Sequence, residues 1–157
     1  MSTWTTTGRI SQKSTVADKL RVLVDVNVVL DVLARRQPYF EGSAQVWAAI
    51  ETGRAEGLLA AHTVTTLHYL LKRHTDHARA VAVLTDVLGV FEVAPVDRHV
   101  LLAALALGGR DFEDAVQMAA AASAGATHIV TRNTPDFRRS PVAVLQPADL
   151  TALLAAR

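Results

Sequence analysis

The chain has 157 residues, of which 50% are hydrophobic and only 5% are aromatic, a size and composition typical of one globular domain. It has no cysteine, which excludes a disulfide-bonded scaffold, a thiolate zinc site and a thiol nucleophile. The 16 Lys and Arg against 15 Asp and Glu give a net charge of +1, so any nucleic-acid contact needs a local basic patch. The longest apolar run, from Val100 to Leu107, is far shorter than the ~20 residues that span a bilayer. We therefore expect a soluble, cytoplasmic protein that does not enter a membrane.

The N-terminal segment differs from the rest of the chain. Residues 1–20 are rich in Ser and Thr and show no apolar periodicity, which indicates a flexible arm ahead of a single domain over residues 21–157. The pattern changes at Arg21. The β-branched apolar run over residues 21–26 has no polar alternation and predicts a strand buried on both faces, as in a parallel sheet.

Strand and helix patterns alternate along the remaining sequence. Further strands are predicted at 57–62, 90–96, 127–131 and 142–146. Helices are predicted at about 27–36, 43–53, 63–74, 76–89, 97–108, 111–123 and from 147 onward, from their capping residues, apolar periodicity and terminal glycines. This alternation predicts an α/β fold, a three-layer α/β/α sandwich around a mostly parallel sheet of roughly five strands.

Acidic side chains occur where ligands bind in such folds, beyond the carboxyl ends of the strands. Asp25 closes the first predicted strand between two valines, and Asn27 follows it. A carboxylate in such apolar surroundings costs several kcal/mol unless it is paired or coordinates a cation. The alternative is a purely structural role, in which Asp25 or Asn27 caps the next helix.

Two more polar clusters follow later strands. Asp111, Glu113 and Asp114 lie in the opening turn of an Ala-rich helix, where acids are also favoured by the helix dipole alone. The other cluster follows the fourth predicted strand and consists of Thr131, Arg132, Asn133 and Asp136. Such residues are common in turns, but Phe137 would anchor this loop against the domain.

Convergent carboxylates without thiols or nearby histidines suit a hard cation with oxygen ligands, Mg²⁺ or Mn²⁺. The six histidines are scattered, which favours surface or packing roles over a zinc site. Other templates are absent from the sequence. It has no Walker A motif, no GxGxxG after the first strand and no GxSxG, which disfavours P-loop nucleotide hydrolysis, dinucleotide redox chemistry and α/β-hydrolase chemistry.

The order and spacing of these segments resemble a known family. VLVDVNVVLDVL, AHTVTTLHYLLKR and RDFEDAVQMAAAASAGATHIVTRNTPDF are similar to PIN domains, of the kind found as toxins of bacterial type II toxin–antitoxin pairs, over about residues 21–150. The resemblance implies a PIN-like fold and a metal-dependent endoribonuclease. It marks Asp25, Asp114 and Asp136 as the metal-holding acids and Asn133 as the polar residue before the last of them.

The resemblance also implies further roles and partners. Hydrolysis of RNA by metal-activated water would leave a 3′-hydroxyl and a 5′-phosphate. Auxiliary roles are expected for Asn27, Thr65, Thr66, Asp111, Glu113 and Thr131. The basic residues around the expected crevice, which would contact RNA or form ordinary solvated surface, are Arg35, Arg36, Lys72, Arg73, Arg132, Arg138 and Arg139. The expected partners are an RNA substrate and a small antitoxin protein, and a homodimer is left open.

One departure from the family pattern keeps other interpretations open. Many PIN domains carry a Glu in the helix after the second strand, where this chain has Thr65 and Thr66 and no acid. The alternative function is therefore a catalytically weak or inactive PIN-like module that binds RNA or protein. A receiver-like or phosphatase domain is a further alternative. A phosphatase would have DxD where this chain has Asp25-Val26-Asn27, and a receiver would have a phosphoacceptor Asp after its third strand, where Asp97 is typical of a helix cap.

Overall fold

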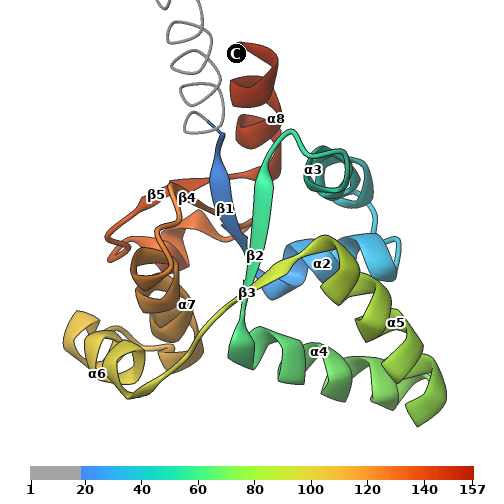
Figure 1. Cartoon of the computed structure of the whole chain (residues 1–157), viewed down its shortest axis with the longest axis horizontal. Helices are drawn as coiled ribbons and strands as arrows, with labels where there is room; N and C mark the ends of the chain where they lie inside the picture. Colours follow the sequence, from blue (N-terminus) through green and yellow to red (C-terminus); the bar gives the residue numbers. More distant parts are fainter. Residues whose placement is uncertain (1–18) are drawn as a thin grey trace, which may run out of the picture.

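The structure is a computed structural model that describes residues 19–157, with one parallel sheet at its centre (Figure 1). The strands are β1 (Arg21–Val24), β2 (Glu56–Ala60), β3 (Glu92–Ala94), β4 (His128–Val130) and β5 (Ala143–Leu145). Their order across the sheet is β3-β2-β1-β4-β5, and every neighbouring pair is parallel. All five strands therefore end at the same edge of the sheet, which brings the residues after β1, β2 and β4 together.

Helices connect the strands and cover both faces of the sheet (Figure 1). They are α2 (Val26–Leu33), α3 (Phe40–Glu51), α4 (Ala61–His74), α5 (His77–Val90), α6 (Arg98–Leu107), α7 (Phe112–Ser123) and α8 (Pro147–Ala155), with a short 3₁₀ helix η1 (Thr134–Phe137) after β4. The predicted α/β/α sandwich with a five-stranded parallel sheet is confirmed.

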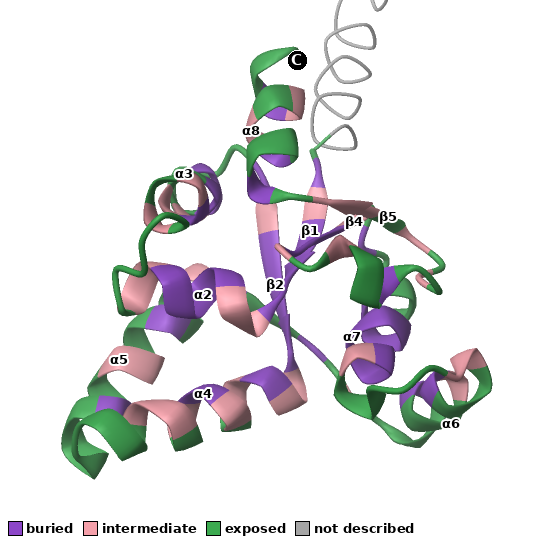
Figure 2. Ribbon diagram, turned by 180° about the vertical axis from the view of Figure 1, so that it is seen from behind, coloured by how far each residue is buried: buried purple, intermediate pink, exposed green. Residues whose placement is uncertain are grey.

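Two apolar cores lie on the two faces of the sheet, because successive side chains of a strand point to opposite faces. Val22 and Val24 of β1 pack with residues of α2, α3, α4, α5 and α8 in one core. Leu23, between them, belongs to the other core, which α6 and α7 cover. Figure 2 shows most of β1, β2 and α7 as buried. This burial on both faces explains the uninterrupted apolar run in the sequence of β1.

Several predicted boundaries shift by a few residues. Leu20, assigned to the N-terminal arm, is 6% exposed and belongs to the core, so the ordered chain begins earlier than expected; the rest of the predicted arm up to residue 18 lies outside the described residues. The helix α4 begins at Ala61, without the predicted Thr63 cap, directly after a shorter strand. The loop after β4 contains η1, which Pro135 helps to start.

Three helices begin at capping aspartates, of which the caps at Asp76 and Asp97 were predicted. Asp76, Asp97 and Asp111 precede α5, α6 and α7, and each side chain accepts a hydrogen bond from the backbone N–H three residues later. In the part of the chain that the structure describes, none of the helices is both long and apolar enough to cross a bilayer.

Candidate active site

Asp25 lies at the carboxyl end of β1, on the residue before α2, and is 3% exposed. Although it occupies the N-cap position, its side chain makes no capping hydrogen bond. Its Oδ1 accepts a hydrogen bond of 3.2 Å from Nε2 of Gln117, and its Oδ2 accepts one of 2.9 Å from Oγ1 of Thr131. The alternative role for Asp25, a side chain that caps the next helix, is therefore excluded by this geometry. Asp25 is a buried carboxylate that two neighbouring side chains orient.

Gln117 was missed by the sequence analysis. It is 3% exposed in the middle of α7, and its Oε1 has no hydrogen-bonding partner within residues 19–157. The available signal was its position, because Gln117 follows Asp114 by three residues and is the one polar residue between Ala115 and Ala122. A polar side chain at that spacing lies above the acid on the same helix face.

Asp114 is the acid whose environment is most perturbed. It lies in the first turn of α7, where its backbone N–H donates a 3.1 Å hydrogen bond to Oδ1 of Asp111. The pKa of the Asp114 carboxyl is raised from 3.8 to about 7, first by burial and then by the negative charges of four other acids. Those acids are Asp111, Asp25, Asp136 and Glu113, in decreasing order of effect. The acids at the ends of β1 and β4 and at the start of α7 thus act on one another electrostatically.

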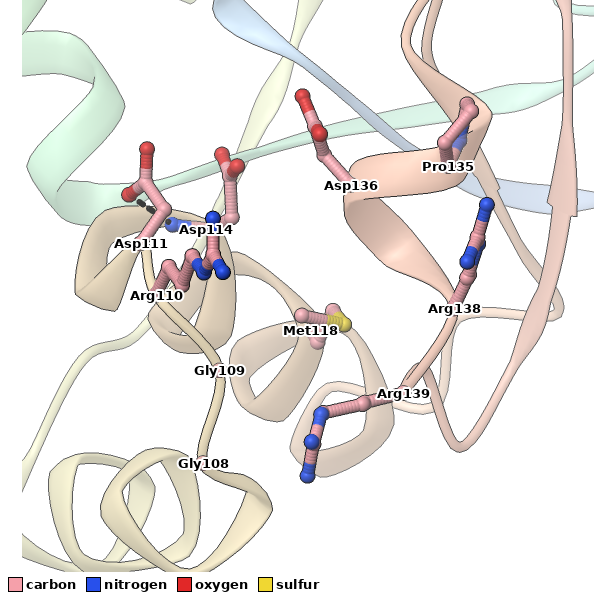
Figure 3. A pocket seen from close by; sticks show the side chains of 10 residues that line it. All are labelled: Gly108, Gly109, Arg110, Asp111, Asp114, Met118, Pro135, Asp136, Arg138 and Arg139. Carbon is pink, nitrogen blue, oxygen red and sulfur yellow. Dashed lines mark hydrogen bonds between the residues drawn. The ribbon is translucent and has the colours of Figure 1, made fainter.

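A cavity of about 410 Å³ opens beside these acids (Figure 3). Asp111 and Asp114 from the start of α7 lie across from Asp136 of η1, while Arg138 and Arg139 lie below Asp136 in this view. The cavity is lined by Gly108, Gly109, Arg110, Asp111, Asp114, Met118, Pro135, Asp136, Arg138 and Arg139. Carboxylates and guanidinium groups therefore share one opening, which suits a cation together with a phosphate.

The short helix η1 sets the position of Asp136. Phe137, the next residue, is 2% exposed in the core under α7, which confirms the predicted anchor. The backbone N–H of Asp136 donates a 3.0 Å hydrogen bond to the carbonyl of Asn133. Because Phe137 holds one side of η1 in the core, exposed Asp136 is turned toward the cavity (Figure 3).

The predicted auxiliary residues lie in different surroundings. Thr131 is fully buried, and its Oγ1 also accepts a 3.1 Å hydrogen bond from the N–H of exposed Asn133. Asn27 is half-buried in the first turn of α2, next to Asp25 in the chain. Glu113 is exposed, and its carbonyl lies 3.2 Å from Nε2 of His62.

Thr65 and Thr66 are not brought to the cavity. Both hydroxyls donate to the carbonyl of His62, at 2.7 Å and 3.1 Å, within the helix α4. Side chains bonded to their own helix in this way do not replace the charge of a glutamate. The residue of α4 that reaches α7 is His62, whose role the sequence analysis did not anticipate.

The basic residues divide into two groups. Arg138 and Arg139 line the cavity, as does Arg110, which the sequence analysis missed although it directly precedes Asp111. Lys72 and Arg73 lie in the last turn of α4, about 15 Å along the helix axis from His62 at 1.5 Å per residue.

The remaining predicted RNA contacts have other neighbours. Arg36 lines a separate cavity between α2 and α4, and the Arg35 guanidinium lies 5.7 Å from the centre of the Phe40 ring. Arg132 pairs with Asp31, at 2.7 Å between Nε and Oδ2. The structure thus gives Arg132 a buried protein partner.

Comparison with known proteins agrees with this arrangement. The family model described as "PIN domain" matches residues 21–135. The chain belongs to the PIN domain family. Among curated proteins it is similar to "Ribonuclease VapC1" of Aquifex aeolicus (strain VF5), 25% identical over 130 residues that cover 80% of this chain and 89% of the relative.

Solved structures confirm the PIN fold. The chain resembles a DNA-bound VapBC from Salmonella typhimurium with a TM-score of 0.63 and 16% identity, covering 82% of this chain and 98% of that one. It resembles VapBC-1 from nontypeable Haemophilus influenzae with a TM-score of 0.66 and 12% identity, covering 82% and 99%. At these identities the likeness establishes the fold, and the chemistry depends on the residues of this PIN domain.

The donor atoms of this PIN domain suit a hard divalent cation. The acids at the sheet edge offer only oxygen ligands, and buried Gln117 adds an unused acceptor beside Asp25. Within residues 19–157, however, no three His, Asp or Glu side chains are arranged to hold one metal ion together. Mg²⁺ is commonly held by one or two carboxylates, several waters and the phosphates of a substrate. The site therefore fits a cation that is held partly by waters and by the phosphate of a substrate, rather than by protein ligands alone.

Proposed function

We propose that this PIN domain protein is a Mg²⁺- or Mn²⁺-dependent endoribonuclease that acts as the toxin of a bacterial toxin–antitoxin pair. The observation that carries the proposal is the cavity that Asp114 and Asp136 line together with Arg138 and Arg139. Support for RNA as substrate comes from the relative named a ribonuclease, and support for a toxin from a structural neighbour described as a toxin-antitoxin complex from Klebsiella pneumoniae. The cytoplasm, where cellular RNA is found, is the expected place of action.

The proposed roles follow from position and charge. Asp114 and Asp136 would hold the cation or its waters from opposite sides of the cavity, with Asp25 behind them. When bound, the cation lowers the pKa of water and offsets charge that develops on the phosphate. Thr131 keeps Asp25 in one orientation, and Asn133, whose backbone is bonded to the Thr131 hydroxyl, would orient water or phosphate.

The arginines at the cavity would bind the negatively charged backbone of RNA. Arg110, Arg138 and Arg139 line the same opening as the acids, so their charge reduces the repulsion that a phosphate meets there. The Nη1 of Arg139 donates a 3.1 Å hydrogen bond to the carbonyl of Leu107, which directs this side chain along the wall of the cavity. Asp25, Asp114 and Asp136 thus act on the reacting phosphate, while the arginines bind the strand around it.

Cleavage of mixed RNA by the purified protein tests the proposal. We expect cleavage with Mn²⁺ or Mg²⁺, none with EDTA, and loss of cleavage in Asp25→Asn. Thr85→Val, an exposed change on α5, is the matched control and should cleave as the wild type does. Metal-dependent cleavage that Asp25→Asn leaves intact would refute the assigned site. No cleavage under any condition would favour the alternative of a binding module.

The toxin role is tested separately in cells. Expression of the chain alone should slow bacterial growth, and Asp114→Asn should not, because the variant keeps the fold and loses one acid of the cavity. The expected partner is a small antitoxin whose segment covers the cavity and presents a cation to the acids. Equal growth with both forms, at equal soluble amounts, would refute the toxin role without affecting the ribonuclease proposal.

A further inference from the structure

We infer that Asp31 and Arg132 are positioning residues, whose buried ion pair holds the loop between β4 and η1 in place for the reaction. This loop carries Thr131 and Asn133 and leads into Asp136. The inference rests on the proposed ribonuclease function and extends it, since it gives Arg132 a role through other residues and no contact with RNA.

The pair has the geometry of a two-point clamp. Nε of Arg132 donates to Oδ2 of Asp31 at 2.7 Å, and Nη2 donates to Oδ1 at 3.2 Å. The side chain of Asp31 is fully buried and that of Arg132 is 18% exposed. A guanidinium that binds both oxygens of a carboxylate fixes direction as well as distance, which a single hydrogen bond does not.

Two further contacts hold the pair from the side of α3. Oγ of Ser43 donates a 3.1 Å hydrogen bond to Oδ2 of Asp31. The guanidinium of Arg132 lies 3.8 Å from the centre of the Tyr39 ring, which places a planar cation over an aromatic face. The pair thus connects α2, the start of α3 and the loop after β4.

Hydrogen bonds continue from the clamp to the acids. Arg132 lies between Thr131, whose Oγ1 donates to Asp25, and Asn133, whose N–H donates to that same Oγ1. The carbonyl of Asn133 accepts from the N–H of Asp136. A shift of Arg132 would therefore reach both acids through adjacent residues.

The opposite end of the clamp is tied to the site as well. Asp31 lies on α2, the helix that begins directly after Asp25. Asp25 therefore directly precedes the short helix that carries Asp31, the anchor of the loop that leads into Asp136. Because a buried ion pair is often no more stabilising than apolar residues of similar size, fold stability alone does not account for this one. Fixing the relative position of two acids does.

Steady-state cleavage of RNA by Arg132→Met, Asp31→Asn and Arg132→Lys tests the inference. We expect the first two changes to lower kcat by about tenfold or more, because small displacements of reacting groups are costly, and to leave KM within about twofold. Arg132→Lys keeps the charge and loses the fork, so it should recover part of kcat. Arg79→Met, on exposed α5, is the control and should match the wild type. A raised KM with unchanged kcat and a weaker salt dependence in Arg132→Met would show an RNA contact and overturn the inference.

Amide hydrogen exchange measured by NMR gives a readout that needs no activity. In Asp31→Asn and Arg132→Lys, the N–H groups of Asn133 and Asp136 should exchange faster by about tenfold, relative to that of Leu23 in β1. These two variants keep the size of the side chains, so they serve if Arg132→Met does not fold. If the wild type cleaves no RNA, the proposed function fails and the exchange still decides the positioning role. Unchanged exchange at both amides would overturn it.

Discussion

The hydroxyl of Thr131 donates a 2.9 Å hydrogen bond to Oδ2 of Asp25, between residues 106 positions apart in the chain. Thr131 directly follows β4 and Asp25 directly follows β1, and these two strands are neighbours in the sheet. The backbone N–H of Asp25 also donates to the carbonyl of Val130 at 3.0 Å. Strand pairing thus brings a hydroxyl and a carboxylate into contact at a site from which water is nearly excluded.

Thr131→Val should destabilise the protein by about 1–3 kcal/mol, because it leaves a buried carboxylate oxygen without its donor. The measurement is the free energy of unfolding from urea titration, without metal. Thr85→Val removes a similar hydroxyl from an exposed position of α5, where the hydroxyl donates to the carbonyl of Val81. This change should alter the free energy of unfolding by less than about 0.5 kcal/mol. Equal effects of the two changes would contradict a special role for the Thr131 hydroxyl.

The pKa of Asp114 predicts a pH dependence of stability in the metal-free protein. Burial and the neighbouring acids raise this pKa from 3.8 to about 7, so between these values the folded state binds more protons than the unfolded state. The contribution of Asp114 to the free energy of unfolding is therefore fully present below about pH 4 and is lost as the pH rises to about 7. Asp114→Asn should be more stable than the wild type at pH 8 and should show a flatter profile. Parallel profiles for the two proteins from pH 4 to pH 8 would contradict the assigned pKa.

Mn²⁺ or Mg²⁺ should raise the melting temperature, because an ion that binds only the folded state relieves repulsion among the acids. At ten times the dissociation constant the gain is about 1.4 kcal/mol, or about 3–5 °C for a domain of this size. Since a cation competes with the proton on Asp114, the affinity should increase as the pH rises through about 7. Calorimetric titration with Mn²⁺ should give one ion per chain. Two tight sites without RNA would show that Asp111 or Glu113 also binds metal.

Arginines at the cavity should differ in their effects from those elsewhere. Arg138→Met and Arg139→Met should each raise KM for RNA several-fold and reduce the salt dependence of binding by about one phosphate contact. Arg36 lines a separate cavity between α2 and α4, so Arg36→Met should leave KM and the salt dependence of binding unchanged. Steady-state kinetics at several salt concentrations measures both. If Arg36→Met had the largest effect, RNA would run along α2 and α4.

Local patterns in the sequence were sufficient for the fold class and the elements. The apolar runs predicted five strands, and Asp76, Asp97 and Asp111 predicted helix starts, because capping and strand burial depend on residues close together in the chain. The resemblance to PIN domains is confirmed by the family match over residues 21–135. The roles of Asp25, Asp114 and Asp136 stay predictions that the proposed experiments test.

Contacts between distant segments depended on the tertiary structure. No local pattern shows that Gln117 donates to Asp25, or that Arg132 pairs with Asp31 on α2. Thr65 and Thr66 bond within α4, while His62 reaches α7. Which polar side chains meet is decided by strand order and helix packing, and these arise from the burial of the whole apolar surface rather than from the sequence near any one residue.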